Sequence, residues 1–377
     1  MKILFISNIS NKITSFATAS ICASKKMGFD FQHTANWSGA EKGQIERDEA
    51  EYGIKIHNVP ISRSPFSKSN ITAYKQIKKL ISDENIDFIH CNTPVGGLIG
   101  RLAGKKYKVP KVIYTAHGFH FYKGAPLFNR TVLKWAEKWM ARYTDAIITM
   151  NKEDYESAKK FKLRGDGKVY LVHGVGIDLS LYDNIEVNRE EKRAELGLKE
   201  TDVAFISMGD LIARKNYSVA IKALAKAGNE NAQYFICGKG PLEAELKELA
   251  KNLGVENQVH FLGFRTDIKE LLVAADVFLF TTLQEGLPRS MMEAMASGLP
   301  CIVSKIRGNV DLMEDGTGGY LCGSTDVESF AKSITELTEN SELRKKMSEY
   351  NLEHIKEFDI SVVEKEIEDI YNEVLGE

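Results

Sequence analysis

Short β-branched runs, each followed by a longer amphipathic run, alternate along this sequence and do so twice over. In the first half they include KILFI at residues 2–6 and KVIYTAH at 111–117. The pattern restarts after a polar stretch at roughly 183–202, with VAFISMG at 203–209 and DVFLFTT at 276–282. Strands that alternate with helices form parallel sheets that helices cover. The sequence therefore predicts an α/β fold of two Rossmann-like, doubly wound parallel-sheet domains.

The length supports the same division, because 377 residues exceed what one hydrophobic core usually serves. We place an N-terminal domain at residues 1–178 and a C-terminal domain at 179–357. The terminal segment, about 358–377, reads as an amphipathic helix that we expect to pack back on the N-terminal domain.

The sequence shows neither a membrane-spanning run nor the pattern of a signal peptide. No apolar run reaches about 18 residues, which a membrane-spanning helix needs. The opening MKILFISN is too short and too quickly polar for a signal peptide. Five scattered cysteines without a CxxC pair argue against a zinc site or disulfides and indicate a reducing cytoplasm.

The charge is uneven. Residues 1–180 hold 28 Lys and Arg against 16 Asp and Glu, whereas the remainder holds 22 against 36. A basic half indicates an anionic partner, such as phospholipid headgroups, a lipid diphosphate or nucleic acid. No nucleic-acid recognition motif is present, so we do not expect that partner. The alternative is that the uneven charge only keeps the chain soluble.

The segment EGLPRSMMEAMASGLP, residues 285–300, predicts an anion site. Pro288 fits the first turn of a helix and Gly298 its end, so the preceding turn presents backbone amides and the positive end of the helix dipole. Glu285 lies in that turn. Glu293 lies on the helix, where a carboxylate can accept hydrogen bonds from ribose hydroxyls. Alternatively, Glu285 is a capping residue and Glu293 a surface position opposite a methionine-rich core.

Other strand ends carry further candidates. Arg214 and Lys215 are expected to open a helix after a strand, where two cations can clamp a diphosphate; the alternative is two solvated charges. The loop after HFLGF, with Phe264 and Arg265, is a candidate nucleobase region. GKG at 238–240 lacks the third glycine of GxGxxG, and we interpret it as a structural turn.

Together these segments resemble the retaining glycosyltransferases of family four, whose GT-B fold has two Rossmann-like domains facing a central cleft. The match comprises the E-x7-E pair Glu285 and Glu293, with GDLIARKNY, GKGPLEAEL, FLGFRTDIKELLVAADVFL and RGNVDLMEDGTGGYL, over about residues 200–325. The first half matches more loosely through VIYTAHGFHFYKGAP, DAIITMN and HGVGID. Those segments look most like the transferases of bacterial capsule and exopolysaccharide gene clusters.

The resemblance implies a donor site in the C-terminal domain. Arg214 and Lys215 would neutralise the donor diphosphate, with the amides of Gly286 and Leu287 near the phosphates. Glu293 would bind the donor ribose.

It also implies that Glu285 and His117 are the catalytic residues, both in contact with the donor sugar. The alternative is that His117, at a strand end, is a structural group. No DxD-like motif follows a strand, so we expect no divalent metal and no cofactor besides the UDP-sugar donor.

Three segments depart from the family pattern. Gly209-Asp210 replaces a common Gly-Arg, and the first loop, SNISNKITS, has no glycine pair. RGNVD, with Asn309 and Asp311, replaces Gly-Gly-x-x-Glu. Any phosphate contacts of Ser7, Asn8 and Asn309 are therefore open.

We expect a retaining hexosyltransferase that moves a sugar, an N-acetylated hexosamine, from a UDP-sugar to a polyprenyl-diphosphate-linked saccharide in bacterial surface polysaccharide synthesis. The alternatives are a UDP-sugar 2-epimerase of the same fold and a non-catalytic nucleotide-sugar-binding partner subunit.

The segment HFYKGAPLFNRTVLKWAEKWMARYTDA, residues 120–146, interleaves basic and aromatic side chains. That pattern suits a membrane interface and predicts peripheral binding to the anionic inner leaflet of the plasma membrane. The alternative is that Trp135 and Trp139 form one core stripe four residues apart.

Overall fold

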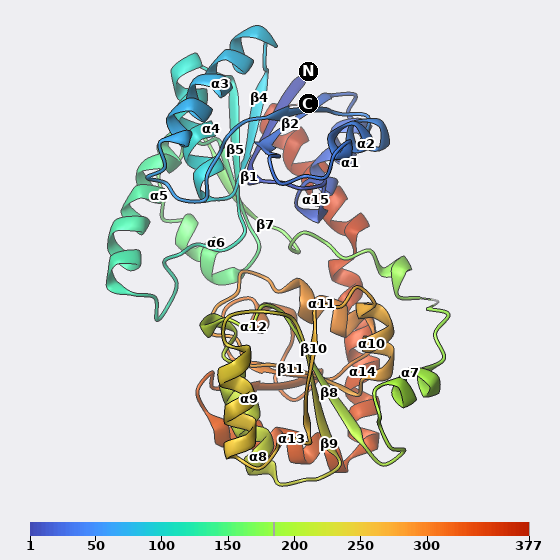
Figure 1. Cartoon of the computed structure of the whole chain (residues 1–377). Helices are drawn as coiled ribbons and strands as arrows, with labels where there is room; N and C mark the ends of the chain where they lie inside the picture. The colour runs from blue at the N-terminus through green and yellow to red at the C-terminus, as the bar shows by residue number, and fades with distance from the viewer. Residues whose placement is uncertain (184, 377) are drawn as a thin grey trace. The chain divides into compact units, whose positions relative to one another are not determined.

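The chain divides into two units, shown in Figure 1. The structure, a computed structural model, describes residues 1–183 and 185–376. The N-terminal unit comprises Met1–Gly176 and Ile360–Glu377, and the C-terminal unit Ile177–Asp359.

A seven-stranded parallel sheet forms the N-terminal unit, in the order β3-β2-β1-β4-β5-β6-β7. Its strands are β1 (Lys2–Ile9), β2 (Asp30–Asn36), β3 (Lys55–Asn58), β4 (Phe88–Asn92), β5 (Lys111–Ala116), β6 (Ala146–Thr149) and β7 (Lys168–Leu171). The order reverses between β1 and β4, which is where doubly wound sheets bind ligands.

Helices cover both faces of this sheet, with α3 and α4 on one side and α1 and α15 on the other (Figure 1). They are α1 (Ser15–Lys26), α2 (Gln44–Tyr52), α3 (Ser69–Asp83), α4 (Pro94–Tyr107), α5 (Lys134–Met140), α6 (Lys152–Ala158) and α15 (Ile360–Leu375). A π-helical turn, Asn129–Leu133, precedes α5, and a 3-10 turn, Ala141–Tyr143, follows it.

Glycines let α4 approach the sheet closely. A Cβ on Gly97 would lie 2.5 Å from the Tyr114 ring, and one on Gly100 would lie 2.4 Å from the sulfur of Cys91. Both distances are too short for real contacts, so larger side chains would push α4 away. This close packing fixes the start of α4 beside the ends of β1 and β4.

The last helix, α15, completes the N-terminal unit. Its residue Tyr371 is fully buried, and the Tyr371 hydroxyl lies 2.6 Å from Nδ1 of His90 on β4. The Tyr371 ring also meets Phe88 edge to face, with centroids 5.4 Å apart. Residues 281 positions apart thus share one core.

A six-stranded parallel sheet forms the C-terminal unit, in the order β10-β9-β8-β11-β12-β13. Its strands are β8 (Val203–Met208), β9 (Ala232–Cys237), β10 (Val259–Gly263), β11 (Val277–Phe280), β12 (Cys301–Ser304) and β13 (Gly319–Cys322). The order reverses between β8 and β11.

One helix, α7, precedes the first strand of this unit, and the other helices follow the strands. They are α7 (Arg189–Glu195), α8 (Tyr217–Ala227), α9 (Glu243–Asn252), α10 (Ile268–Ala274), α11 (Arg289–Ala296), α12 (Asn309–Leu312), α13 (Val327–Glu339) and α14 (Ser341–His354), with 3-10 turns at Leu179–Leu181, Ala213–Lys215 and Ile355–Phe358.

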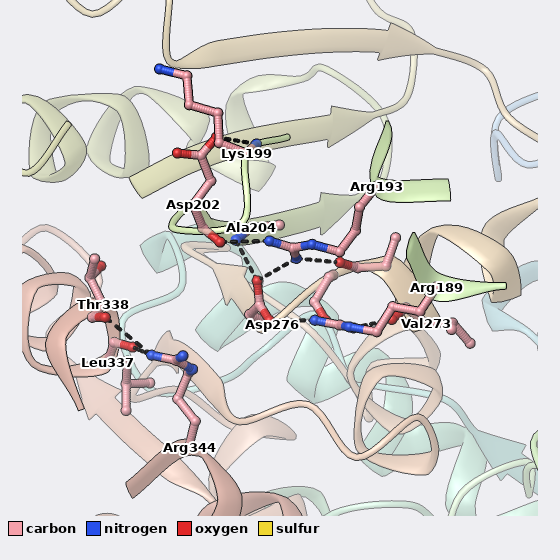
Figure 2. A network of polar contacts seen from close by, with 12 residues as sticks. Arg189, Arg193, Lys199, Asp202, Ala204, Val273, Asp276, Leu337, Thr338 and Arg344 are labelled. Carbon is pink, nitrogen blue, oxygen red and sulfur yellow. Dashed lines mark hydrogen bonds and ion pairs between the residues drawn. The ribbon is translucent and has the colours of Figure 1, made fainter. Parts of the chain in front are cut away.

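A polar network ties α7 to the sheet (Figure 2). The Asp276 carboxylate, just before β11, accepts from Arg189 at 2.5 Å and from Arg193 at 2.9 Å. It also accepts the amide of Ala204 on β8 at 2.8 Å. One carboxylate therefore anchors the first helix of the unit to its two central strands.

The prediction of an α/β fold with two Rossmann-like parallel sheets is confirmed. Two local features of the structure do not follow from the alternating pattern. β13 gives no clear apolar run in the sequence, because its segment, GYLC, is four residues long and follows a glycine-rich turn. The 129–143 segment is not one regular α-helix, since it begins with a π-helical turn and ends with a 3-10 turn.

Candidate active site

Glu285 and two cations form a compact cluster in the C-terminal unit. One oxygen of Glu285, Oε1, accepts from Arg214 Nη1 at 2.7 Å, Lys215 Nζ at 2.8 Å and the Thr282 hydroxyl at 2.9 Å. Lys215 and Glu285 are largely buried, with 12% and 14% of their side chains exposed, whereas Arg214 is 40% exposed. Two positive charges against one negative leave the cluster with an excess positive charge that can receive an anion.

The sheet topology explains why these residues meet. Arg214 and Lys215 follow β8, Thr282 and Glu285 follow β11, and these two strands are neighbours where the strand order reverses. The two loops are also joined by backbone, because the Leu283 amide donates to the Arg214 carbonyl at 2.8 Å. The predicted site therefore lies at the switch point of the sheet.

The expectation that Arg214 and Lys215 open a helix is wrong. They lie in the 3-10 turn Ala213–Lys215, and α8 begins only at Tyr217. Asn216 separates the two with a left-handed backbone, φ 54°, which interrupts a helix. The turn points both cations at Glu285.

The backbone of the turn before α11 is packed against a third loop. Arg307 Nε donates to the carbonyl of Glu285 at 3.0 Å. Gly308 has φ +85°, and a Cβ there would lie 2.5 Å from the carbonyl oxygen of Gly286. Gly286 and Leu287, the predicted phosphate-binding positions, are thus held from the side by the loop after β12.

Asn309, the first residue of α12, directly follows that loop. It is fully buried, and its amide nitrogen donates to the Ser304 carbonyl at 2.8 Å. Its Oδ1 and the Ser304 hydroxyl have no hydrogen-bond partner within the described residues. Buried polar atoms without partners cost free energy, so this pair is a feature that folding alone does not account for.

Glu293 lies on α11 near a tyrosine. Its Oε1 accepts from Arg289 at 3.0 Å, and its charge helps raise the pKa of Tyr182, behind the larger effect of burial. The helix buries Met291 and Met295 on its other side. Glu293 is thus partly buried and faces Arg289 and Tyr182, while Glu285 is no helix cap, because Pro288 occupies that position.

In the predicted nucleobase loop, Phe264 is exposed but Arg265 is already paired with acidic residues. Phe264 is 71% exposed. Arg265 is paired with Asp267 and, at 3.1 Å, with Glu195, and these hydrogen bonds raise its pKa. Arg265 therefore stabilises the loop and connects it to Glu195 on α7.

The GKG turn is structural, as predicted. A Cβ on Gly238 would lie 1.9 Å from the carbonyl oxygen of Gly209, and one on Gly240 2.4 Å from that of Leu211. Only glycine fits so close to the β8 loop that carries Arg214.

His117 belongs to the N-terminal unit, where it follows β5. Its Nε2 is hydrogen-bonded to Oδ1 of Asn92, its Nδ1 lies 3.2 Å from the sulfur of Met150, and its ring meets Phe16 edge to face at 4.7 Å. Burial lowers the pKa of His117 to about 4. The imidazole is therefore neutral near pH 7, and it donates through Nε2 because the amide oxygen of Asn92 can only accept.

A cavity of about 670 Å³ adjoins His117 within the N-terminal unit. Its polar walls come from the ends of β1 and β4, with Asn8 and Asn92, and its apolar walls from Tyr114, Phe119 and Met140 among others. The volume falls in the range of small-ligand sites. Its position, where the strand order reverses between β1 and β4, matches the rule for doubly wound sheets.

Ser7 and Asn8, whose roles were open, both have partners in the fold. Asn8 Oδ1 accepts from the Gly96 amide and from the Thr93 hydroxyl, both at 2.7 Å, so it holds the start of α4. The Ser7 hydroxyl lies 3.2 Å from Nε2 of His33. Thr282, Arg307 and Asn92 were not among the predicted site residues; Thr282 and Asn92 could have been found because each lies at a predicted strand end.

The aromatic segment before β6 is exposed. Phe128, Val132, Trp135 and Trp139 repeat at helical spacing, and between 36% and 66% of each is accessible. The two indole rings are parallel, with centroids 6.5 Å apart. The core-stripe alternative is therefore wrong, and we call these four residues the apolar stripe. Among the described residues, no helix has the length and hydropathy needed to cross a membrane.

Comparison with known proteins shows the family and the fold of this chain. The family "Glycosyl transferases group 1" matches residues 188–354, which contain the Glu285 cluster, and "Glycosyl transferase 4-like" matches residues 35–151, which contain His117. The structure is similar to that of Anabaena HepE in complex with UDP and glucose, with a TM-score of 0.80, 20% identity, and coverage of 99% of this chain and 100% of that one.

Two relatives extend the comparison. The "Putative glycosyltransferase EpsD" of Bacillus subtilis (strain 168) is 34% identical over 98% of this chain and 96% of its own length. The UDP-Gal:α-D-GlcNAc-diphosphoundecaprenol α-1,3-galactosyltransferase of Escherichia coli is 31% identical over 81% of this chain and 79% of its own. With a full-length relative at this identity and both domain families matched, the chain belongs to the group 1 glycosyltransferases and has their GT-B fold.

Proposed function

We propose that this glycosyltransferase transfers a sugar, with retention of configuration, from a UDP-sugar to a polyprenyl-diphosphate-linked saccharide in bacterial surface polysaccharide synthesis. The observation that carries the proposal is the Glu285 cluster, in which Arg214 and Lys215 converge on one carboxylate oxygen at the switch point. The name of the E. coli relative, which states a diphosphoundecaprenol-linked acceptor, supports the acceptor class, and the B. subtilis relative is named as a glycosyltransferase.

The chemical problem is the negative charge that develops on the departing diphosphate. Arg214, Lys215 and the backbone around Gly286 and Leu287 offer fixed positive groups to that charge, and preorganised groups of this kind are usually the largest single contribution to catalysis. Glu285 orients both cations before the donor arrives and then contacts the donor sugar. Glu293 accepts hydrogen bonds from the donor ribose.

His117 has the second catalytic role in the proposal. As a neutral imidazole fixed by Asn92, it contacts the donor sugar without adding a charge that would oppose the developing positive charge at the anomeric carbon. The loop with Phe264 and Arg265 would contact the nucleobase. We propose an N-acetylated hexosamine as the transferred sugar and no requirement for a divalent metal.

The proposed location is the cytoplasmic face of the plasma membrane. The apolar stripe and the neighbouring Lys134, Lys138 and Arg142 give a helix with aromatic and basic side chains exposed together. Such helices lie in the headgroup region of anionic membranes, where a lipid-linked acceptor is presented.

The test begins with thermal stabilisation by a panel of UDP-sugars and GDP-sugars, since a ligand at about 100 times its Kd adds about 2.7 kcal/mol. The stabilising donor is then incubated with a short-chain polyprenyl-diphosphate-linked saccharide, and the anomeric configuration of the product is read by NMR. The expected result is acceptor-dependent UDP release with a retained anomer. A change of the sugar in the absence of acceptor would indicate the epimerase, and binding without release would indicate the partner subunit; either would overturn the proposal.

A further inference from the structure

A second hollow, of about 300 Å³, lies in the N-terminal unit beside the first cavity. It is lined by Lys123, Arg130 and Lys134, together with Phe121, Leu127 and Glu153. Phe121 lines both hollows. The second hollow lies next to the apolar stripe, because Leu127, which is 73% exposed, immediately precedes Phe128 in the chain. It therefore adjoins both the His117 cavity and the exposed aromatic surface.

The three cations of this hollow lack acidic partners. None of their side chains forms an ion pair in the part of the chain that the structure describes. Lys134 Nζ lies 6.0 Å from the centroid of the Phe121 ring, which is a weak cation–π contact. Glu153 is the acid among the lining residues, and its Oε1 accepts the Lys123 backbone amide at 2.6 Å. Three positive charges against one negative leave a net charge of +2.

The like charges of the hollow repel one another. Arg130 lies in the π-helical turn and Lys134 begins α5 four residues later, and like charges near that spacing cost about 0.2–0.5 kcal/mol per pair. By contrast, Arg101 on α4 is paired in two places with Glu137 on α5, at 2.9 and 3.2 Å. The buried Arg101 is thus neutralised by an acid, whereas the three exposed cations of the hollow have no acidic side-chain partner among the described residues.

We propose that this basic hollow binds the diphosphate of the lipid-linked acceptor. The inference rests on the proposed function and specifies how its acceptor is held. A lipid diphosphate carries about two negative charges, which match the net +2 of the hollow, and guanidinium and ammonium groups are the usual phosphate ligands. The order of the three surfaces then follows the acceptor: saccharide in the His117 cavity, diphosphate in the basic hollow, isoprenoid along the apolar stripe.

The test measures binding directly, so that it does not depend on transfer. Geranyl diphosphate is titrated against the whole chain by calorimetry, without vesicles and with saturating UDP, which occupies Arg214 and Lys215. Arg130→Gln and Lys134→Gln are each expected to weaken binding roughly tenfold, as loss of one charge-assisted hydrogen bond does. Lys138→Gln is the matched control, because it removes the same charge from α5 outside the hollow.

One variant must move in the opposite direction. Glu153→Gln keeps the oxygen that accepts the Lys123 amide but removes the negative charge, so it is expected to tighten binding severalfold. Equal losses in all three lysine and arginine variants, or a Glu153→Gln variant that binds no tighter, would overturn the proposal.

A competition arm separates the acceptor from a membrane phospholipid. Vesicles of phosphatidylglycerol, which carry a single phosphate per headgroup, are added to the complex with geranyl diphosphate. Retention of the diphosphate supports the proposal, and its displacement at equal phosphate concentration would assign the hollow to phospholipid headgroups. UDP-dependent thermal stabilisation, measured in parallel, reports the donor site alone and shows whether a failure belongs to the proposed function instead.

Discussion

Replacing Glu285 by glutamine is expected to strengthen donor binding and to slow sugar transfer. Glu285 is the only acidic residue of the cluster described above, and one of its oxygens accepts hydrogen bonds from Arg214, Lys215 and Thr282. A donor diphosphate must therefore compete with Glu285 for the same two cations. Glutamine keeps the size and one acceptor oxygen but removes the charge, which leaves both cations to the diphosphate.

The magnitude follows from the charges. The cluster changes from a net charge of +1 to +2, and removal of one repulsive charge about 6 Å from the diphosphate, at an effective dielectric constant near 40, is worth about 1.4 kcal/mol. We expect UDP to bind roughly tenfold more tightly to Glu285→Gln than to the unmodified protein. Transfer is expected to fall by about two orders of magnitude or more, because the carboxylate also contacts the donor sugar in the proposed reaction.

Calorimetry with UDP and an acceptor-dependent UDP-release assay measure the two effects. Arg214→Gln is the comparison, since it should weaken UDP binding by a similar factor. The double variant should return close to the original affinity, because it removes one positive and one negative charge and so restores the net charge of +1. Weaker UDP binding by Glu285→Gln would refute the view that this carboxylate and the diphosphate use the same cations.

Four further outcomes are expected. Burial lowers the pKa of His90 to about 3 and that of His117 to about 4, so below pH 6.5 the unfolded state binds more protons than the folded state. Denaturant titration should therefore show that the free energy of unfolding falls by about 2 kcal/mol per histidine between pH 7 and pH 5. Gly308→Ala should lower the unfolding free energy by about 1–3 kcal/mol and weaken UDP binding, as its Cβ meets the Gly286 carbonyl, whereas a Tm within a degree of the original would contradict this. Trp135→Ser should reduce flotation with anionic vesicles at low salt but leave UDP binding unchanged. Transfer should survive EDTA, and metal-dependent recovery would refute the metal-free expectation.

Much of the fold could be predicted because parallel strands, buried on both faces, leave nearly continuous apolar runs in the sequence. The switch-point position of Glu285 and Arg214 followed from the same pattern, since each residue comes just after such a run. The 3-10 turn at Ala213–Lys215 could not be predicted, because it depends on a left-handed Asn216 that no periodicity reveals.

The tertiary contacts were equally hidden. That three donors converge on a single oxygen of Glu285 depends on side-chain packing between two loops about 70 residues apart. The exposure of Trp135 and Trp139 could not be decided either, since spacing of four residues is common to core and surface stripes. The basic hollow arises from Lys123 and Arg130, which are close only because the chain turns between them.

The packing of α15 has a consequence for how the protein is made. Because Tyr371 fills the interior beside Phe88 and His90, the C-terminal unit is an insertion within the N-terminal one. On the ribosome, the C-terminal unit can finish folding while the N-terminal unit still lacks α15. The domain translated first is therefore the last to become native, and a truncation that removes only α15 should expose the core of the N-terminal unit.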